Sequence, residues 1–186
     1  MVNRPTTSTL VKHIVWAFNH ATLEEKAEGI DWYFTANKVA AGLAELHGIS
    51  VKKTSLVISA LSPATDWDKN VIDAGNFIED TNAVVSTYGN NKRIAARALS
   101  GEVEELNGKK TRAFAKLIEN PYADEVVIDR HAISVALGHK SDDTERRYYA
   151  STGYDLMVGA YHAAAVKLNL KASELQAIVW VSYRNR

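Results

Sequence analysis

Apolar residues recur along this chain at the spacing of one helix face. Leu10, Val11, Ile14, Val15 and Phe18 form the first such stripe, directly after the cap-forming stretch 6–9. Spacings of three and four residues are typical of amphipathic helices, whereas strands alternate with a period of two. A capping box at 22–25 predicts the start of a second helix or turn, and a further helix is predicted to end at Gly48. Later apolar stripes, with their caps and breakers, predict helices near 50–61, 66–78, 90–99, 111–118, 131–137, 142–168 (broken near Gly153) and 173–183.

Strand patterning is confined to Val126–Ile128, which is too short to build a sheet. No internal repeat or linker interrupts the chain. The sequence therefore predicts an all-α protein of roughly nine or ten helices in a single domain spanning residues 1–186. Aromatic residues such as Trp32 and Trp180 are expected to serve mainly in core packing.

Composition supports a folded chain and excludes several chemistries. Apolar residues make up 46% of the 186 positions, which is enough for a sizeable core and excludes a disordered chain. No apolar run is long enough to span a bilayer, and the first residues lack a signal-peptide core, so we expect a cytoplasmic protein with no membrane partner. The absence of cysteine excludes disulfides and thiolate catalysis, and the six histidines lack zinc-ligand spacing. We therefore expect neither a metal nor a cofactor.

Charge gives only weak support to a nucleic-acid partner. The chain has 22 basic and 22 acidic residues, so no basic excess favours tight nonspecific binding to phosphates. One stretch is nevertheless rich in basic residues, namely Lys92, Arg93, Arg97, Lys109, Lys110, Arg112 and Lys116. Such a run is also typical of a solvated helix face.

The most informative pair of residues is Lys110 and Asp129. Lys110 follows a short turn containing Gly108 and opens a predicted helix, together with Lys109, Thr111 and Arg112. A helix N-terminus behind such a turn is able to hold a phosphate. Asp129 lies nineteen residues later, directly before the helix that begins with Arg130 and His131. A lysine amine and a carboxylate are together able to open a glycosidic bond in DNA, although a basic first turn and an ordinary helix cap are the simpler interpretation.

Two other stretches are candidates for contacts with a base or a phosphate. Ser62, Thr65, Asp66, Trp67 and Asn70 combine a stacking surface with polar groups that a flipped base requires. The alternative is that Trp67 packs in the core while Asp66 caps a helix. Asn91 and Lys92 follow a glycine turn and are placed to touch phosphate, although a plain turn and cap explain them as well.

The stretches Leu106-Asn-Gly-Lys-Lys-Thr-Arg-Ala-Phe114 and Val127-Ile-Asp-Arg-His131 resemble the helix-hairpin-helix DNA glycosylase superfamily, in particular endonuclease III and the archaeal 8-oxoguanine glycosylases. The stretch Ala60-Leu-Ser-Pro-Ala-Thr-Asp-Trp-Asp-Lys-Asn70 is similar to the segment that lines the lesion pocket in endonuclease III. The resemblance covers roughly residues 50–137. It implies two helical lobes with a cleft, DNA as the partner, Lys110 as the nucleophile and Asp129 as the catalytic carboxylate.

The sequence also departs from that superfamily. Its hairpin is shortened to Asn107-Gly108-Lys109, so one phosphate-binding glycine is missing, and no iron–sulfur loop follows. Pro63 stands where endonuclease III has a glutamine that fills the gap left by a flipped base. These departures resemble a phage and actinobacterial branch linked with thymine hypermodification, which would place a phage-encoded protein in the host cytoplasm.

Three functions follow as alternatives. The first is a glycosylase with lyase activity on a modified or damaged base in DNA. The second is a transferase that attaches an amino acid or polyamine to an activated hydroxymethyluracil on the same fold. The third is a noncatalytic DNA-binding module. The sequence leaves open the base, the strand preference and the oligomeric state.

Overall fold

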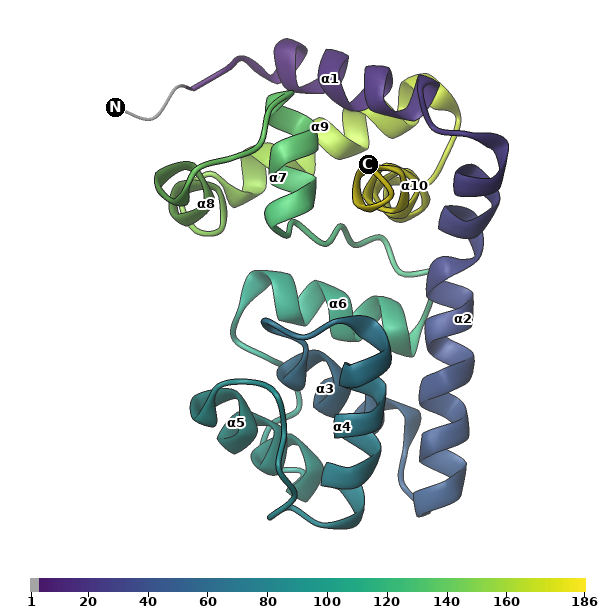
Figure 1. Cartoon of the computed structure of the whole chain (residues 1–186), viewed down its shortest axis with the longest axis vertical. Helices are drawn as coiled ribbons and strands as arrows, with labels where there is room; N and C mark the ends of the chain where they lie inside the picture. The colour runs from purple at the N-terminus through teal and green to yellow at the C-terminus, as the bar shows by residue number, and fades with distance from the viewer. Residues whose placement is uncertain (1–3) are drawn as a thin grey trace. The chain divides into compact units, whose positions relative to one another are not determined.

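The computed structural model describes residues 4–186, and every regular element in that range is an α-helix. Figure 1 labels the ten helices, which are α1 (Thr7–Asn19), α2 (Leu23–His47), α3 (Val51–Leu61), α4 (Trp67–Glu79), α5 (Gly89–Ser100), α6 (Lys109–Glu119), α7 (Arg130–Leu137), α8 (Asp143–Tyr149), α9 (Tyr154–Leu168) and α10 (Ala172–Arg184). The all-α prediction is confirmed. The run Val126–Ile128 is buried but forms no strand, so its apolar side chains serve packing.

One predicted boundary is wrong. The capping box at Thr22 and Glu25 is present, with reciprocal bonds of 2.9 and 3.1 Å between each main-chain N–H and the other side chain. The helix that it starts is not separate from the predicted helix that ends at Gly48, because both belong to the 25 uninterrupted residues of α2. No proline interrupts residues 23–47, and the helix ends before Gly48, whose φ of 64° is left-handed.

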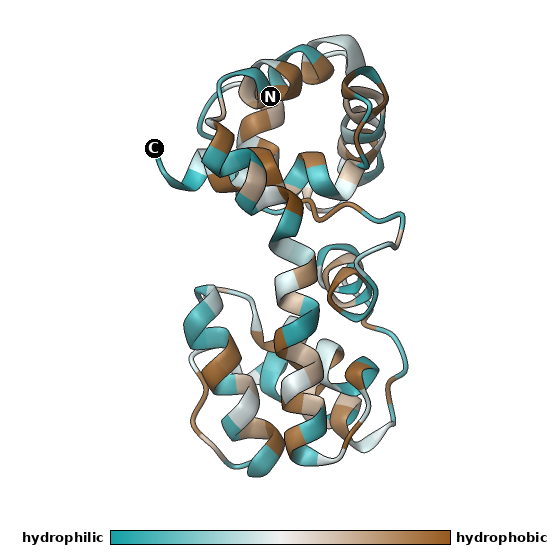
Figure 2. Ribbon diagram, turned by 90° about the vertical axis from the view of Figure 1, so that its right-hand side faces the viewer, coloured by the Kyte–Doolittle hydropathy of each residue, from teal (hydrophilic) through white to brown (hydrophobic). Residues whose placement is uncertain are grey.

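The chain divides into two compact units. Residues 4–33 and 124–186 form what we call the terminal unit, and residues 34–123 form the middle unit. Helix α2 contributes its first part to the terminal unit and its second part to the middle unit. Figure 2 shows that each helix carries both apolar and polar residues, as expected for amphipathic helices.

Helix α10 is the central element of the terminal unit, where it contacts α1, α7 and α9. Nine of its residues are buried, including Leu175, Ile178 and Val179. Gly29 on α2 allows a close approach to this helix, since a Cβ at Gly29 would lie 2.4 Å from Cα of Ile178. This packing fixes the position of the side chains that α10 presents toward α7.

Helix α3 has the same role in the middle unit, where it packs against α4, α5 and α6. Its residues from Thr54 to Leu61 are all buried, although three of them carry hydroxyl groups. The hydroxyl of Ser59 donates to the main-chain carbonyl of Thr111 at 2.6 Å and so links the middle of α3 to the first turn of α6. This hydrogen bond holds the turn that carries Lys110.

Candidate functional site

Asp129 is the N-cap residue of α7, as its position before the predicted helix indicates. Its Oδ1 atom accepts hydrogen bonds from the main-chain N–H groups of His131 at 2.9 Å and Ala132 at 2.8 Å. These two hydrogen bonds satisfy N–H groups in the first turn of α7, which have no carbonyl partner within the helix. The residue as a whole is half-buried.

The second oxygen of this carboxylate has a partner that sequence reasoning missed. The indole Nε1–H of Trp180 on α10 donates to Oδ2 of Asp129 at 3.1 Å. The half-buried ring of Trp180 lies edge-on to Trp32, with centroids 5.5 Å apart, and the guanidinium of Arg184 lies 4.5 Å from its centroid. Trp180 is 51 residues from Asp129 in sequence, and no local pattern indicates this contact.

Two buried tyrosines close enough to feel the charge of this carboxylate donate their hydrogen bonds to other groups. Tyr33 donates to Oε1 of Gln176 at 2.8 Å, and Tyr161 donates to the carbonyl of Ala132 at 3.0 Å. Burial raises the pKa of both tyrosine hydroxyls well above the ordinary value, and the negative charge of Asp129 raises it further. Both hydroxyls therefore remain protonated at neutral pH and hold the surroundings of α7 in place.

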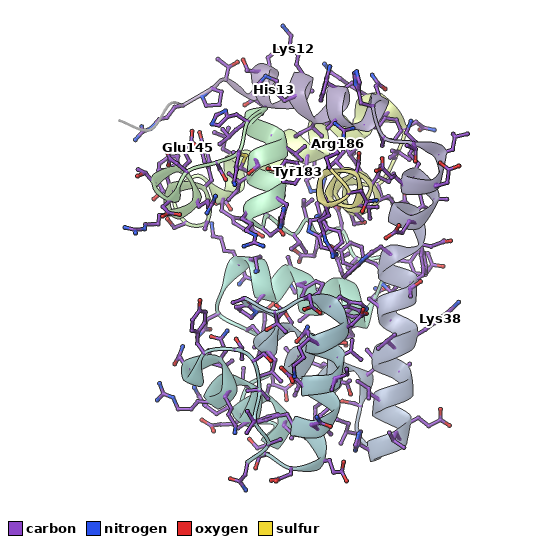
Figure 3. The ribbon with its side chains drawn as sticks, in the orientation of Figure 1. Lys12, His13, Lys38, Glu145, Tyr183 and Arg186 are labelled. Carbon is purple, nitrogen blue, oxygen red and sulfur yellow. The ribbon has the colours of Figure 1, made fainter. Side chains whose placement is uncertain are left out.

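Arg130 and His131 follow Asp129 in the first turn of α7. The Nε–H of Arg130 donates to Nε2 of His131 at 3.0 Å, so this ring nitrogen serves as an acceptor. Burial lowers the pKa of His131, the nearby Asp129 opposes this effect, and the positive charges of Arg130, Arg184 and Arg146 lower the pKa further. His131 is therefore neutral at neutral pH. Its ring lies 5.4 Å from that of Tyr183, which Figure 3 labels on α10.

The middle unit contains the other candidate catalytic residue, Lys110, in the first turn of α6. Gly108 is the N-cap of this helix and has an ordinary φ of −72°. Space rather than backbone angle favours glycine, because a Cβ there would lie 2.9 Å from the hydroxyl of Thr111, which bonds to the Gly108 carbonyl at 3.1 Å. Lys109 precedes Lys110 on the helix. Lys110 is half-buried, and its side chain makes no hydrogen bond or ion pair with residues 4–186.

The turn before α6 is acidic, which the basic run in the sequence does not suggest. The ion pairs of this segment include Arg97–Glu102 at 2.7 Å, Lys52–Glu104, Lys116–Glu105 at 3.1 Å and Arg112–Glu105 at 3.9 Å. These carboxylates offset several of the positive charges that were expected to meet phosphate. The hairpin is therefore poorly suited to strong electrostatic binding of a duplex.

The predicted pocket segment 62–66 forms the connection between α3 and α4. Ser62 ends α3 and donates to the carbonyl of Ser59 at 2.9 Å, while Asp66 caps α4 by accepting from the Lys69 N–H at 3.0 Å. Between them, Ala64 has a left-handed φ of 65°, which is strained for a residue with a Cβ. The connection is thus held in one shape by caps on both sides.

Three further predicted binding residues of this segment serve its internal structure. The hydroxyl of Thr65 lies 3.4 Å from the carbonyls of Leu61 and Pro63. Trp67 is half-buried and lies edge-on to Phe114 of α6, with centroids 6.4 Å apart. Asn70 is 1% exposed and donates to the Ile58 carbonyl at 3.1 Å, so its side chain packs α4 against α3.

The segment before α5 is tied to the same connection. Thr87 donates to the carbonyl of Pro63 at 2.9 Å, and the amide of Asn91 donates to the Thr87 hydroxyl at 3.2 Å. The ammonium of Lys92 donates to the Ala83 carbonyl at 2.7 Å. Asn91 and Lys92 therefore have partners within the protein where contacts with phosphate were expected.

The structure brings together the three predicted stretches of the middle unit. The hydrogen bond from Ser59 to Thr111 joins α3 to α6, the contact of Trp67 with Phe114 joins α4 to α6, and Thr87 bonds to Pro63. Lys110 belongs to this unit. Asp129, together with Arg130 and His131, belongs to the terminal unit, where Trp180 completes its surroundings.

Residues 4–186 contain neither a metal-binding cluster nor a membrane-spanning helix. No group of three or more His, Asp or Glu side chains is placed to hold a metal ion. None of the helices in that range has the length and apolar character needed to cross a membrane.

Comparison with known proteins gives a family but no activity. No curated protein and no solved structure matches the chain. One family model, whose description is "Family of unknown function (DUF7178)", matches residues 1–186. Because the match covers the whole sequence, the chain belongs to the DUF7178 family.

Proposed function

We propose that this protein is a DNA base-processing enzyme of the glycosylase and lyase type, with Lys110 as nucleophile and Asp129 as the carboxylate that assists it. The proposal includes the helix-hairpin-helix glycosylase fold, with its two lobes and cleft, and a flipped-out modified or damaged base as substrate. It rests on the sequence resemblance and on the surroundings of the two residues.

The observation that carries the proposal is the set of hydrogen bonds that hold both carboxylate oxygens of Asp129 in place. Three N–H donors converge on its carboxylate, from His131, Ala132 and Trp180, at 2.8 to 3.1 Å. An ordinary N-cap needs only the main-chain donors, and here both oxygens are fixed. A negative charge held in a fixed position is suited to stabilising the positive charge that develops on a deoxyribose ring as its glycosidic bond breaks.

Lys110 supplies the nucleophile in the same reaction. The amine attacks C1′ of the nucleotide and forms a new C–N bond, while the glycosidic bond breaks and its electron pair leaves with the base, which takes up a proton. The sugar ring then opens to give a Schiff base between Lys110 and C1′. Lys110 suits this role because its side-chain amine forms no ion pair with another residue within residues 4–186.

The acidic turn before α6 favours one alternative, a DNA-binding or interaction module without catalysis. Glu102, Glu104 and Glu105 weaken the attraction of this region for phosphate, and the chain has no net charge. Such a module would use Asp129 only as a helix cap. The Asp129→Asn variant, which keeps an acceptor for the cap, distinguishes this alternative from the enzyme.

Mass spectrometry of DNA treated with the protein tests the proposal. Duplex and single-stranded DNA carrying hydroxymethyluracil, its activated derivatives and oxidised or deaminated bases are incubated with the protein in the presence of amino acids and polyamines, and are then digested to nucleosides. Loss of one base, abolished in Asp129→Asn, supports the glycosylase. A new covalent adduct on a base identifies the transferase instead, and unchanged DNA with retained binding identifies the noncatalytic module.

A further inference from the structure

The one interaction at Asp129 that neither a helix cap nor the superfamily resemblance explains is its bond to Trp180. The N-cap role uses only Oδ1, which already accepts from His131 and Ala132. The indole of Trp180 binds the other oxygen, Oδ2, from a helix remote in sequence. We propose that Trp180 is a positioning residue, whose indole N–H orients the Asp129 carboxylate toward a cationic sugar. This inference rests on the proposed function.

The geometry gives Trp180 little freedom to move away from this bond. Its ring is held at one edge by Trp32 and on one face by the guanidinium of Arg184. The backbone of α10 is also fixed, since Val179 and Val181 on either side are 0% and 2% exposed. A donor held in this way fixes the rotation of the carboxylate about its Cβ–Cγ bond, which main-chain donors to one oxygen alone do not.

The hydrogen bond from Trp180 is expected to affect how well Asp129 stabilises a positive charge, rather than how stably the protein folds. Oδ2 accepts one N–H, from Trp180, and a carboxylate oxygen has the capacity for a second interaction. A carboxylate held in one orientation stabilises a positive charge that develops beside it more than a rotating carboxylate does. The fixed carboxylate does not have to reorient as the charge forms. Removing the indole N–H should therefore weaken recognition of a cationic sugar more than recognition of a neutral one.

Binding to two abasic-site analogues tests this inference. One duplex carries a pyrrolidine, which is cationic at neutral pH, and the other carries a neutral tetrahydrofuran. We expect the wild-type protein to prefer the pyrrolidine, and Trp180→Phe to lose about tenfold of that preference, as for a hydrogen bond to a charged group. Asp129→Asn should lose it as well, and the double variant should lose no more than Asp129→Asn. Trp16→Phe, which removes an exposed indole of α1, is the matched control.

The outcomes separate the inference from the proposed function. If Trp180→Phe keeps the full preference while Asp129→Asn loses it, the positioning role is overturned and the function stands. If the wild-type protein does not distinguish the two duplexes, the proposed role of Asp129 fails, and the inference fails with it.

A second measurement needs no variant of Trp180. In the NMR spectrum of the protein with ¹⁵N-labelled tryptophan, Asp129→Asn should shift the indole resonance of Trp180 and leave that of Trp16 unchanged. An unmoved Trp180 resonance would overturn the hydrogen bond on which the inference is built.

Discussion

The carboxylate of Asp73 accepts a hydrogen bond of 2.7 Å from the main-chain N–H of Ser86, thirteen residues later. Asp73 is 1% exposed and also forms an ion pair with Lys69 on the same helix. The bond therefore anchors the segment between α4 and α5, which in turn holds Pro63 through Thr87. One buried acid thus helps to fix the connection that contains the candidate pocket residues.

This anchor predicts a loss of stability in acid. Burial by itself raises the pKa of Asp73, but the hydrogen bonds from Lys69 and Ser86 outweigh it, and the pKa is lowered overall. A folded-state pKa below the unfolded value of about 4 means that the stabilisation is complete above pH 4. It is lost as the pH falls from there through the folded-state pKa.

We expect Asp73→Asn to lower the free energy of unfolding by about 1–3 kcal/mol at pH 7. The difference from the wild-type protein should shrink as the pH falls below about 4. Urea unfolding across this pH range measures it, with Asp31→Asn, an exposed acid of α2, as the control. A difference that is constant with pH would contradict the role assigned to the charge.

The contact between Gly29 and α10 predicts a large effect from one methyl group. A Cβ at Gly29 would lie 2.4 Å from Cα and 2.6 Å from N of Ile178, both main-chain atoms of the helix that carries Trp180. Gly29→Ala should therefore lower the stability by about 1–3 kcal/mol or more. Gly159→Ala, in open space on α9, should instead raise it by about 0.5–1 kcal/mol. Thermal unfolding of both variants checks this, and equal effects would refute the packing described.

The acidic turn before α6 predicts that removal of a carboxylate strengthens DNA binding. Glu105 lies 3.1 Å from the Lys116 ammonium and 3.9 Å from the Arg112 guanidinium. Because this pair is exposed, Glu105→Gln should change stability by less than about 1 kcal/mol. The affinity for duplex DNA should rise several-fold, with a steeper dependence on salt. Fluorescence anisotropy at several salt concentrations measures both, and Glu79→Gln, an exposed acid of α4, should have no effect. An unchanged affinity for Glu105→Gln would show that α6 does not face DNA.

Much of the helical fold was predictable, because its signals are local. Asp66 and Asp129 cap the helices that the sequence placed after them, and Ser50 caps α3. The continuity of α2 was not predictable, since the capping box marks where a helix starts but not how long it runs. The division into two units depends on contacts between distant residues and has no signal in the pattern of apolar positions.

The candidate site was predictable only in part, for the same physical reason. The cap position of Asp129 follows from neighbouring residues, whereas its bond to Trp180 depends on how α10 packs against α7. The basic residues were visible in the sequence, but their pairing with Glu102, Glu104 and Glu105 was not, because the pairs form only when the turn folds. Likewise, Asn70 was expected in a pocket and is instead buried against Ile58.

The most direct test of the proposed function is borohydride trapping on a duplex that contains one abasic site. The aldehyde of that site reacts with a nucleophilic amine whichever base the enzyme prefers, so the substrate need not be known. Borohydride reduces the resulting Schiff base to a stable adduct of protein and DNA, and peptide mass spectrometry locates the modified lysine.

Two lysines provide matched controls. Lys109 is adjacent to Lys110 on α6, and Lys38 points away from α2 in the same unit (Figure 3). We predict an adduct on Lys110 that is lost in Lys110→Met and retained in Lys109→Met and Lys38→Met. The absence of any adduct, or an adduct that persists in Lys110→Met, would contradict the assignment of Lys110 as the nucleophile.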